Sequence, residues 1–237
     1  MKKLLLVFLV SLSAIGANAQ AKLSGFEDVK IGSSTVLRIP AVDGFVHAVP
    51  NSDPRTEYFK RRIAGTNEIL SVYLSNDDWK TVETGQPSVL NFYAQFSTPV
   101  SDEIRGVPPL EFDQFASGNS KGLGLMFEAN GIVKAAALPE IHSKLDENRN
   151  NAASAGLGEL KKLGVFSKNK TMVSLLLTQT GTANGEKITY LITGSSIYLK
   201  NRILFVHIYR RYRSDVDIDI LGLLTAKWTA AIIAANK

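Results

Sequence analysis

Cysteine is absent from this 237-residue chain, and histidine occurs only three times. Without thiol groups, the chain cannot form disulfides, cysteine-type zinc sites, iron–sulfur clusters or haem attached through Cys-x-x-Cys-His, and thiol catalysis is excluded. Three histidines supply few ligands for another metal centre, because zinc needs at least three protein ligands. Core packing must therefore stabilise the fold, and we expect no cofactor.

Motifs that mark common catalytic folds are also missing. The chain has no Gly-x-x-x-x-Gly-Lys-Ser/Thr phosphate loop, no Gly-x-Gly-x-x-Gly after a strand, no Gly-x-Ser-x-Gly elbow and no His-Glu-x-x-His. Gly118, Gly122 and Gly124 lie close together, but neither their spacing nor their context fits a nucleotide-binding loop. Enzymes of those classes are not indicated.

The first nineteen residues have the three parts of a secretory signal peptide. Two lysines form a positive start, an apolar run follows, and Ala17 and Ala19 place small residues at positions −3 and −1 of a cut before Gln20. The run is too short for a stable membrane anchor. We therefore expect cleavage of residues 1–19, with residues 20–237 forming a single α+β domain in a Gram-negative periplasm.

The charge balance is only mildly basic. The formal net charge is +5, and loss of the two leader lysines lowers it to +3. This excess is too small to indicate nucleic-acid binding, but it allows a weak preference for anionic lipid head groups or glycans. We expect an envelope protein or an anionic envelope ligand as partner, no nucleic acid, and no stable membrane span in the mature chain.

Short apolar and β-branched runs in the N-terminal half predict strands over 34–39, 45–49, 69–74 and 89–96. In the third run, alternation predicts that Leu70, Val72 and Leu74 share one face. The fourth run alternates most clearly and predicts an antiparallel strand whose wet face carries Asn91, Tyr93 and Gln95.

The middle of the chain is predicted to be helical over 108–115 and 138–153, with one or two helical turns over 55–63. Prolines 108 and 109 suit a first helical turn. The run 123–127 fits a strand or a helix, and its pattern does not choose between them.

The C-terminal third predicts three consecutive strands over 171–180, 187–199 and 202–213, with a bend near 194–196 in the second. Asn184-Gly185 indicates the first hairpin turn, and residues 200–201 form the second. A final helix over 217–236 has a packing stripe made of Leu221, Leu224, Trp228, Ile232 and Ala235. Lys227 near its centre argues against a membrane span. The order of elements predicts an α+β fold in which helices cover an antiparallel sheet, as an α/β/α-type sandwich with a C-terminal β-meander and terminal helix.

The tail from Thr171 through the meander and the Trp228 helix resembles the α/β sandwich of PsbP and Mog1-like proteins. Asp43-Gly44-Phe45 after Pro40 resembles the early Pro-x-Gly-Phe segment of that class. The resemblance covers strand order and a few punctuating residues, and it brings no catalytic motif. It implies a small accessory or binding domain.

The most distinctive polar cluster is the run 209–213, Tyr-Arg-Arg-Tyr-Arg. Arginine beside aromatic rings can bind phosphates, carboxylates or sugars. The candidate ligand-binding residues are Tyr93, His207, Tyr209, Arg211 and Arg213. A solvated strand end whose arginines pair with Asp215, Asp217 or Asp219 is the alternative.

Two smaller patterns suggest metal ligands but are incomplete. His142 and Asp146 are four apart on a predicted helix, which favours a local hydrogen-bonded pair over a metal site. The alternating acids at 215, 217 and 219 lack the glycine and glutamate of a calcium loop, and they suit the start of a helix.

Two functional hypotheses follow. The first is a non-catalytic periplasmic accessory or binding protein, and we assign no catalytic residues. The second is a cell-envelope hydrolase with a site near His207, where Ser195 and Ser196 lie on the neighbouring predicted strand.

Overall fold

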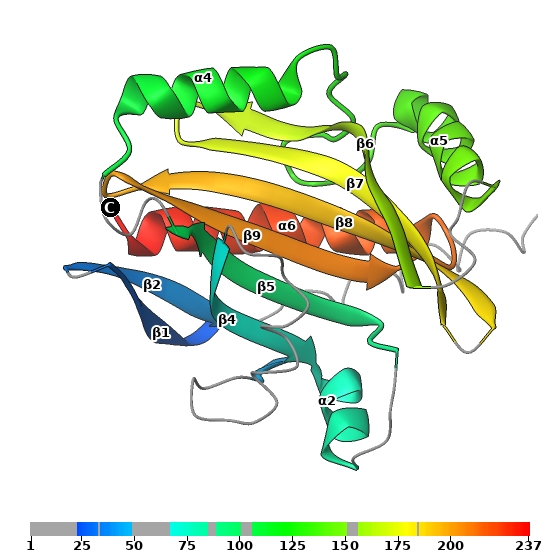
Figure 1. The fold of residues 1–237 in the computed structure, drawn as a ribbon, viewed down its shortest axis with the longest axis horizontal. Helices are drawn as coiled ribbons and strands as arrows, with labels where there is room; N and C mark the ends of the chain where they lie inside the picture. The colour runs from blue at the N-terminus through cyan, green and yellow to red at the C-terminus, as the bar shows by residue number, and fades with distance from the viewer. Residues whose placement is uncertain are drawn as a thin grey trace, which may run out of the picture.

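The structure, a computed structural model, describes residues 23–32, 34–48, 67–84, 89–100, 106–150, 156–183 and 185–237 (Figure 1). The predicted signal peptide with its Ala19–Gln20 cleavage position, and the helical turns predicted over 55–63, lie outside these residues. Seven antiparallel strands form the main sheet in the order β3-β4-β5-β9-β8-β7-β6. Their bounds are β3 Phe45–His47, β4 Asn67–Ser75, β5 Phe92–Pro99, β6 Gly156–Asn169, β7 Met172–Ala183, β8 Glu186–Leu199 and β9 Arg202–Arg211.

One face of the main sheet is covered by the long helix α6 (Val216–Ala235) and by a separate hairpin of β1 (Leu23–Ile31) and β2 (Thr35–Val42). Trp228 of α6 is fully buried, and its indole N–H donates to the carbonyl oxygen of Pro40 in β2 at 2.9 Å. Because the donor is satisfied, the large ring stabilises this core without an unpaired polar atom. The hairpin and the terminal helix therefore form one layer.

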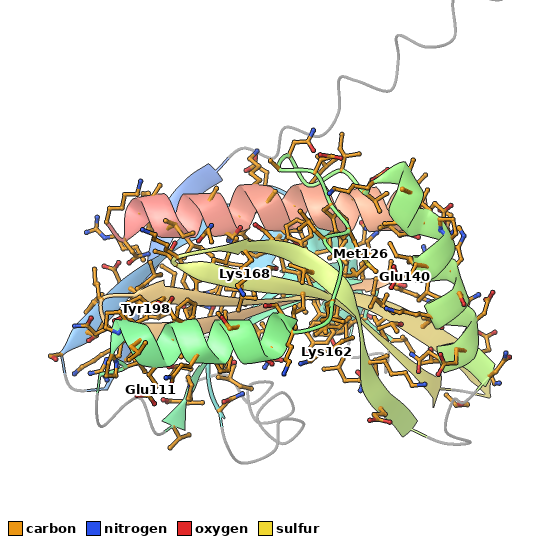
Figure 2. All side chains as sticks on the ribbon, turned by 90° about the horizontal axis from the view of Figure 1, so that it is seen from above. Glu111, Met126, Glu140, Lys162, Lys168 and Tyr198 are labelled. Atoms are coloured by element: carbon orange, nitrogen blue, oxygen red, sulfur yellow. The ribbon has the colours of Figure 1, made fainter. Side chains whose placement is uncertain are left out.

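The opposite face is covered by α4 (Pro109–Ser120), so helices lie on both sides of the sheet (Figure 2). Phe112 and Ala116 of α4 are buried against Val173, Leu175 and other side chains of β7 and β8. The α5 helix (Leu138–Asn150) packs at one end, and α2 (Asn76–Glu83) follows β4. This arrangement confirms the predicted α+β fold with a helix-covered antiparallel sheet.

The predicted C-terminal meander and terminal helix are confirmed, with corrections to their bounds. The meander has a fourth strand, β6, which the sequence did not reveal because three register shifts interrupt its alternation. The predicted bend near 194–196 is absent, since β8 keeps an unbroken register with both neighbours. Strand β9 ends at Arg211, two residues earlier than predicted.

A β-bulge in β4 corrects the predicted face of Leu70. The register with β5 shifts between Ile69 and Ser71, so one extra residue stands in this strand. Val72 and Leu74 are buried on the face that α2 covers, whereas Leu70 packs on the α6 face. A bulge changes the face of every residue on one side of it, and hydrophobic alternation does not reveal it.

The run 123–127, whose pattern fitted a strand or a helix, is neither a regular strand nor a helix. It is an extended segment with single bridges, one pairing Leu125 with Val165 of β6 and one pairing Phe127 with Val133. The amide of Met126 donates to the Val165 carbonyl at 2.9 Å. This segment therefore covers part of the outer edge of β6.

Helix α6 is long and apolar enough for a membrane span, but the core helix of a soluble protein meets the same criterion. Leu221, Trp228 and Ile232 are fully buried against the sheet. The outer side is also largely apolar, since Leu223 and Ala230 are exposed. A helix that is apolar all round is generally buried on every side, but the main sheet covers only one side of α6.

Candidate functional site

The predicted residues Tyr93, His207 and Tyr209 do come together on the α4 face of the sheet. Tyr93 on β5 is directly opposite Tyr209 on β9, and their rings stack with centroids 4.4 Å apart. His207 lies 6.3 Å from the ring of Tyr209. Burial raises the pKa of Tyr209 to about 12, so its hydroxyl keeps its proton. These side chains form a stripe of aromatic rings on the α4 face.

His207 has no partner that would activate it as a base. Burial lowers its pKa to about 4, so the ring is neutral at physiological pH. Within the described ranges, no residue hydrogen-bonds the ring. Ser195 lies on the opposite face of the sheet, buried, with its Oγ 2.6 Å from Oγ of Ser174. The sheet therefore separates Ser195 from His207, whereas Ser196, opposite Phe205 on β9, lies on the same face as His207.

The arginines near the end of β9 are held by the protein's own groups. Arg210 forms a mostly buried ion pair with Asp217 at 2.6 Å. Arg211 lies 3.7 Å from Glu186, and Arg213 donates to the side-chain oxygen of Asn91 at 2.8 Å. These contacts hold this corner of the fold together, and they engage only some of the five N–H donors of each guanidinium.

The prediction of a solvent-exposed face for β5 is wrong. Gln95 is buried, and Tyr93 lies between the rings of Tyr209 and Tyr190. Asn91 binds the buried carboxylate of Asp78 through both its backbone and its side chain. Polar residues can occupy a covered face when their hydrogen bonds are met internally, and the alternation of polar and apolar residues does not distinguish that case from exposure.

A buried polar cluster that the sequence did not reveal surrounds Glu27 of β1. Its carboxylate accepts hydrogen bonds from Ser71 at 2.7 Å and Tyr73 at 2.8 Å, both on β4. Nε2 of His47 lies 3.0 Å from the other carboxylate oxygen. Burial tends to raise the pKa of Glu27, but these partners outweigh it and lower the pKa.

This cluster is suited to holding the β1–β2 hairpin on the sheet. Burial and the neighbouring carboxylate raise the pKa of Tyr73 far above its usual value, so it remains a hydrogen-bond donor. Ser71 donates to Glu27 but is only 1% exposed, so a substrate cannot reach its hydroxyl. Only one imidazole and one carboxylate are present, and the described residues contain no group of three such side chains that could hold a metal.

His142 pairs with Asp215 and not with Asp146 as predicted. Its Nε2 lies 2.7 Å from Oδ1 of Asp215, which is at the start of α6. The hydrogen bond from His142 lowers the pKa of Asp215. Asp217 and Asp219 face other partners, Arg210 and the amide of Val133, so these three acids do not converge on a calcium site.

A groove of about 650 Å³ lies between β6, α6 and residues 123–129, and we call it the α6–β6 groove. Its apolar lining comes from α6, β6, β7 and the extended segment: Ala226, Ala230, Ile233, Phe166, Met172 and Phe127. Lys168, Ser120 and Glu128 are among its polar lining residues. Its volume is within the range of small-molecule sites, about 300–1,000 Å³.

The groove was not predicted, because its walls come from segments far apart in the chain. Its lysine lies on β6, the strand that was missed, and its extended wall is the run whose structure the pattern left open. The signal available in the sequence was the apolar outer side of the terminal helix, with Leu223 and Ala230 outside the packing stripe.

Comparisons with known proteins give a structural match but no sequence match. No protein-family model and no curated protein matches this chain. Among solved structures, the chain is similar to the crystal structure of the Saccharomyces cerevisiae Ran-binding protein Mog1p, with 12% sequence identity over 91% of this chain and 93% of that chain and a TM-score of 0.34. Mog1p is of the class that the C-terminal third resembles.

Proposed function

We propose that this protein is an exported, non-catalytic binding protein of the bacterial cell envelope, and that its ligand occupies the α6–β6 groove. The single observation that carries the proposal is the groove itself, which combines an apolar wall and floor with a lysine among its lining residues. Binding sites typically have a concave apolar surface with a few polar groups that orient the ligand.

The outer side of α6 supports an apolar ligand. Ala226, Ala230 and Ile233 line the groove on consecutive turns, and Thr229 beside them has its hydroxyl satisfied by the carbonyl of Thr225 at 2.8 Å. This wall therefore offers no free donor to a polar ligand. Covering it with an apolar ligand would remove hydrocarbon surface from water, worth about 25 cal/mol per Å².

The signal-peptide pattern supports the proposed compartment. If the leader is cleaved before Gln20, the mature chain reaches the periplasm, where membrane lipids and their breakdown products are available ligands. Mass spectrometry of the protein purified from the periplasmic fraction tests this part. We expect a mature N-terminus at Gln20, and an intact methionine start in the cytosolic fraction would contradict the proposal.

Binding is tested with a neutral apolar fluorophore such as phenylnaphthylamine, added to the purified mature chain. We expect saturable fluorescence enhancement that Ala230→Trp reduces, because the indole would fill the groove. Ala234→Trp is the matched control, since Ala234 is also exposed on α6 but does not line the groove. Circular dichroism checks that both variants fold. Equal binding by the two variants would contradict the assignment of the groove.

A catalytic role for His207 gives a different result in the same preparation. A hydrolase would act on envelope substrates and would lose that activity in His207→Ala while remaining folded. The proposed binding protein shows no such turnover.

A further inference from the structure

We propose that the ligand of the α6–β6 groove is an anionic amphiphile, with its apolar chain along the α6 wall and its acidic head group bound by Lys168. This inference rests on the proposed function and adds the chemical class of the ligand. It is carried by the charges beside the groove and by the hydrogen bonds that those charges make.

Lys168 lies at the edge of the groove, between α4 and α6 in Figure 2. Its Nζ donates to Oγ of Ser120 at 2.9 Å and to Oγ of Ser117 at 3.5 Å. The Ser120 hydroxyl in turn donates to the carbonyl of Ala116 at 2.8 Å. Ser120 therefore presents its lone pairs to the lysine, which holds the ammonium group in place but leaves its positive charge uncompensated.

Two other lysines at β6 pair with carboxylates. Lys144 lies 2.7 Å from Glu140, and Lys161 lies 3.1 Å from Glu147. Lys168 has no carboxylate within 4.0 Å among the residues that the structure describes. Its exposed ammonium group is thus an unpaired charge at this end of the groove.

Lys162 adds to the positive potential at the same place. Its Nζ donates to the side-chain and backbone oxygens of Asn119, at 3.1 and 3.4 Å, near the last turn of α4. These acceptors are neutral, so they leave the charge of Lys162 uncompensated. Lys121, the first residue after α4, is exposed. Several cations around one helix end attract an anion more strongly than one alone, and salt weakens that attraction.

The apolar part of the groove is suited to a flexible hydrocarbon chain. Met172 lines it beside Phe127, and a thioether side chain adapts to irregular apolar shapes. Glu128 is the only acid among the described lining residues, and it would disfavour a second acidic group nearby. One apolar chain with one acidic head group is therefore the ligand that the lining fits.

The test is competition against the neutral fluorophore by three amphiphiles with the same acyl chain, all kept below micelle-forming concentrations. These are palmitate, palmitoyl lysophosphatidic acid and zwitterionic palmitoyl lysophosphatidylcholine. We expect at least one anionic competitor to bind more tightly than the zwitterion. Palmitate alone would identify a carboxylate head group, and the lysophosphatidic acid alone would identify a phosphate.

Lys168→Gln should weaken the anionic competitors by about tenfold relative to the neutral fluorophore, the loss expected for one charge-assisted hydrogen bond. Lys161→Gln is the matched control on the same strand, because that lysine already pairs with Glu147. Equal competition by all three amphiphiles, or no effect of Lys168→Gln, would overturn the head-group assignment and leave the proposed function standing. Absence of fluorophore binding would overturn both.

Discussion

The side-chain amide of Asn236 hydrogen-bonds both backbone groups of Arg38, 198 positions away in the chain. Its oxygen accepts from the Arg38 amide at 2.8 Å, and its nitrogen donates to the Arg38 carbonyl at 2.8 Å. The Asn236 side chain thus makes the two backbone hydrogen bonds that a neighbouring strand would make with β2. The last turn of α6 is thereby tied to the β1–β2 hairpin.

Asn236→Ala should lower the free energy of unfolding by about 1–3 kcal/mol, because it leaves two backbone groups of β2 without partners. Urea unfolding gives the loss, and hydrogen exchange at the Arg38 amide should accelerate. Lys237→Ala changes the exposed neighbouring residue and should leave both measurements unchanged. Equal effects of the two substitutions would contradict the role of Asn236.

Gly222→Ala should separate α6 from the turn that contains Gly131. A methyl group at position 222 would lie 2.0 Å from the Gly131 carbonyl oxygen, which is backbone and cannot turn aside. We expect a net loss of about 1–3 kcal/mol of unfolding free energy despite alanine's higher helix propensity.

The matched control for that change is Gly118→Ala in α4, where a methyl group would meet nothing within 4 Å. It should be neutral or stabilising by up to about 1 kcal/mol. Calorimetry and urea unfolding compare the two variants. A stable Gly222→Ala protein would show that the backbone contact at Gly131 is not needed.

Asp78→Ala should destabilise the start of β5. The buried Asp78 carboxylate accepts from the Phe92 amide at 2.7 Å, the Asn91 amide at 3.0 Å and the Ser75 hydroxyl at 2.9 Å. Removing it leaves these part-buried donors without an acceptor, which should lower the free energy of unfolding by about 3 kcal/mol. The neighbouring Asp77 is almost fully exposed, so Asp77→Ala should stay within about 0.5 kcal/mol by urea unfolding.

Acid should destabilise the protein through His207. Its pKa is about 4 in the fold and about 6.5 in the unfolded chain. Between those pH values the unfolded chain binds more protons, so the free energy of unfolding falls as the pH falls through this window. Because the ring is still partly exposed, we expect a loss of about 1–2 kcal/mol between pH 7 and pH 5.

Urea unfolding at the two pH values measures this loss in the wild type and in His207→Leu, which keeps the site apolar. The variant should lack the His207 contribution. The same pH dependence in both proteins would mean that His207 is not held neutral by burial.

Local patterns predicted the elements that are continuous runs of strand-forming residues or repeat at helical spacing. Strands β7, β8 and β9 are apolar and β-branched runs bounded by turn residues, and the Leu221, Trp228 and Ile232 stripe recurs at helical spacing, so each can be recognised without reference to the rest of the chain. The turn at Lys200 and Asn201 was also visible, and both residues have the positive φ of a tight hairpin turn.

Register shifts and long-range partners account for what was missed. The bulges in β4 and β6 change faces within a strand, and no residue type marks them. Glu27 meets Tyr73 only because the hairpin folds over the sheet, and His142 meets Asp215 across 73 positions of the chain.

The sequence by itself determined the class of fold, because hydrophobic periodicity records which side of each segment avoids water. Only the tertiary structure placed Lys168 beside Ala230 and Met172 at one groove. Such a site depends on which strand lies at the sheet edge and which helix crosses it. Those relations are set by packing between distant segments and leave no pattern within any one of them.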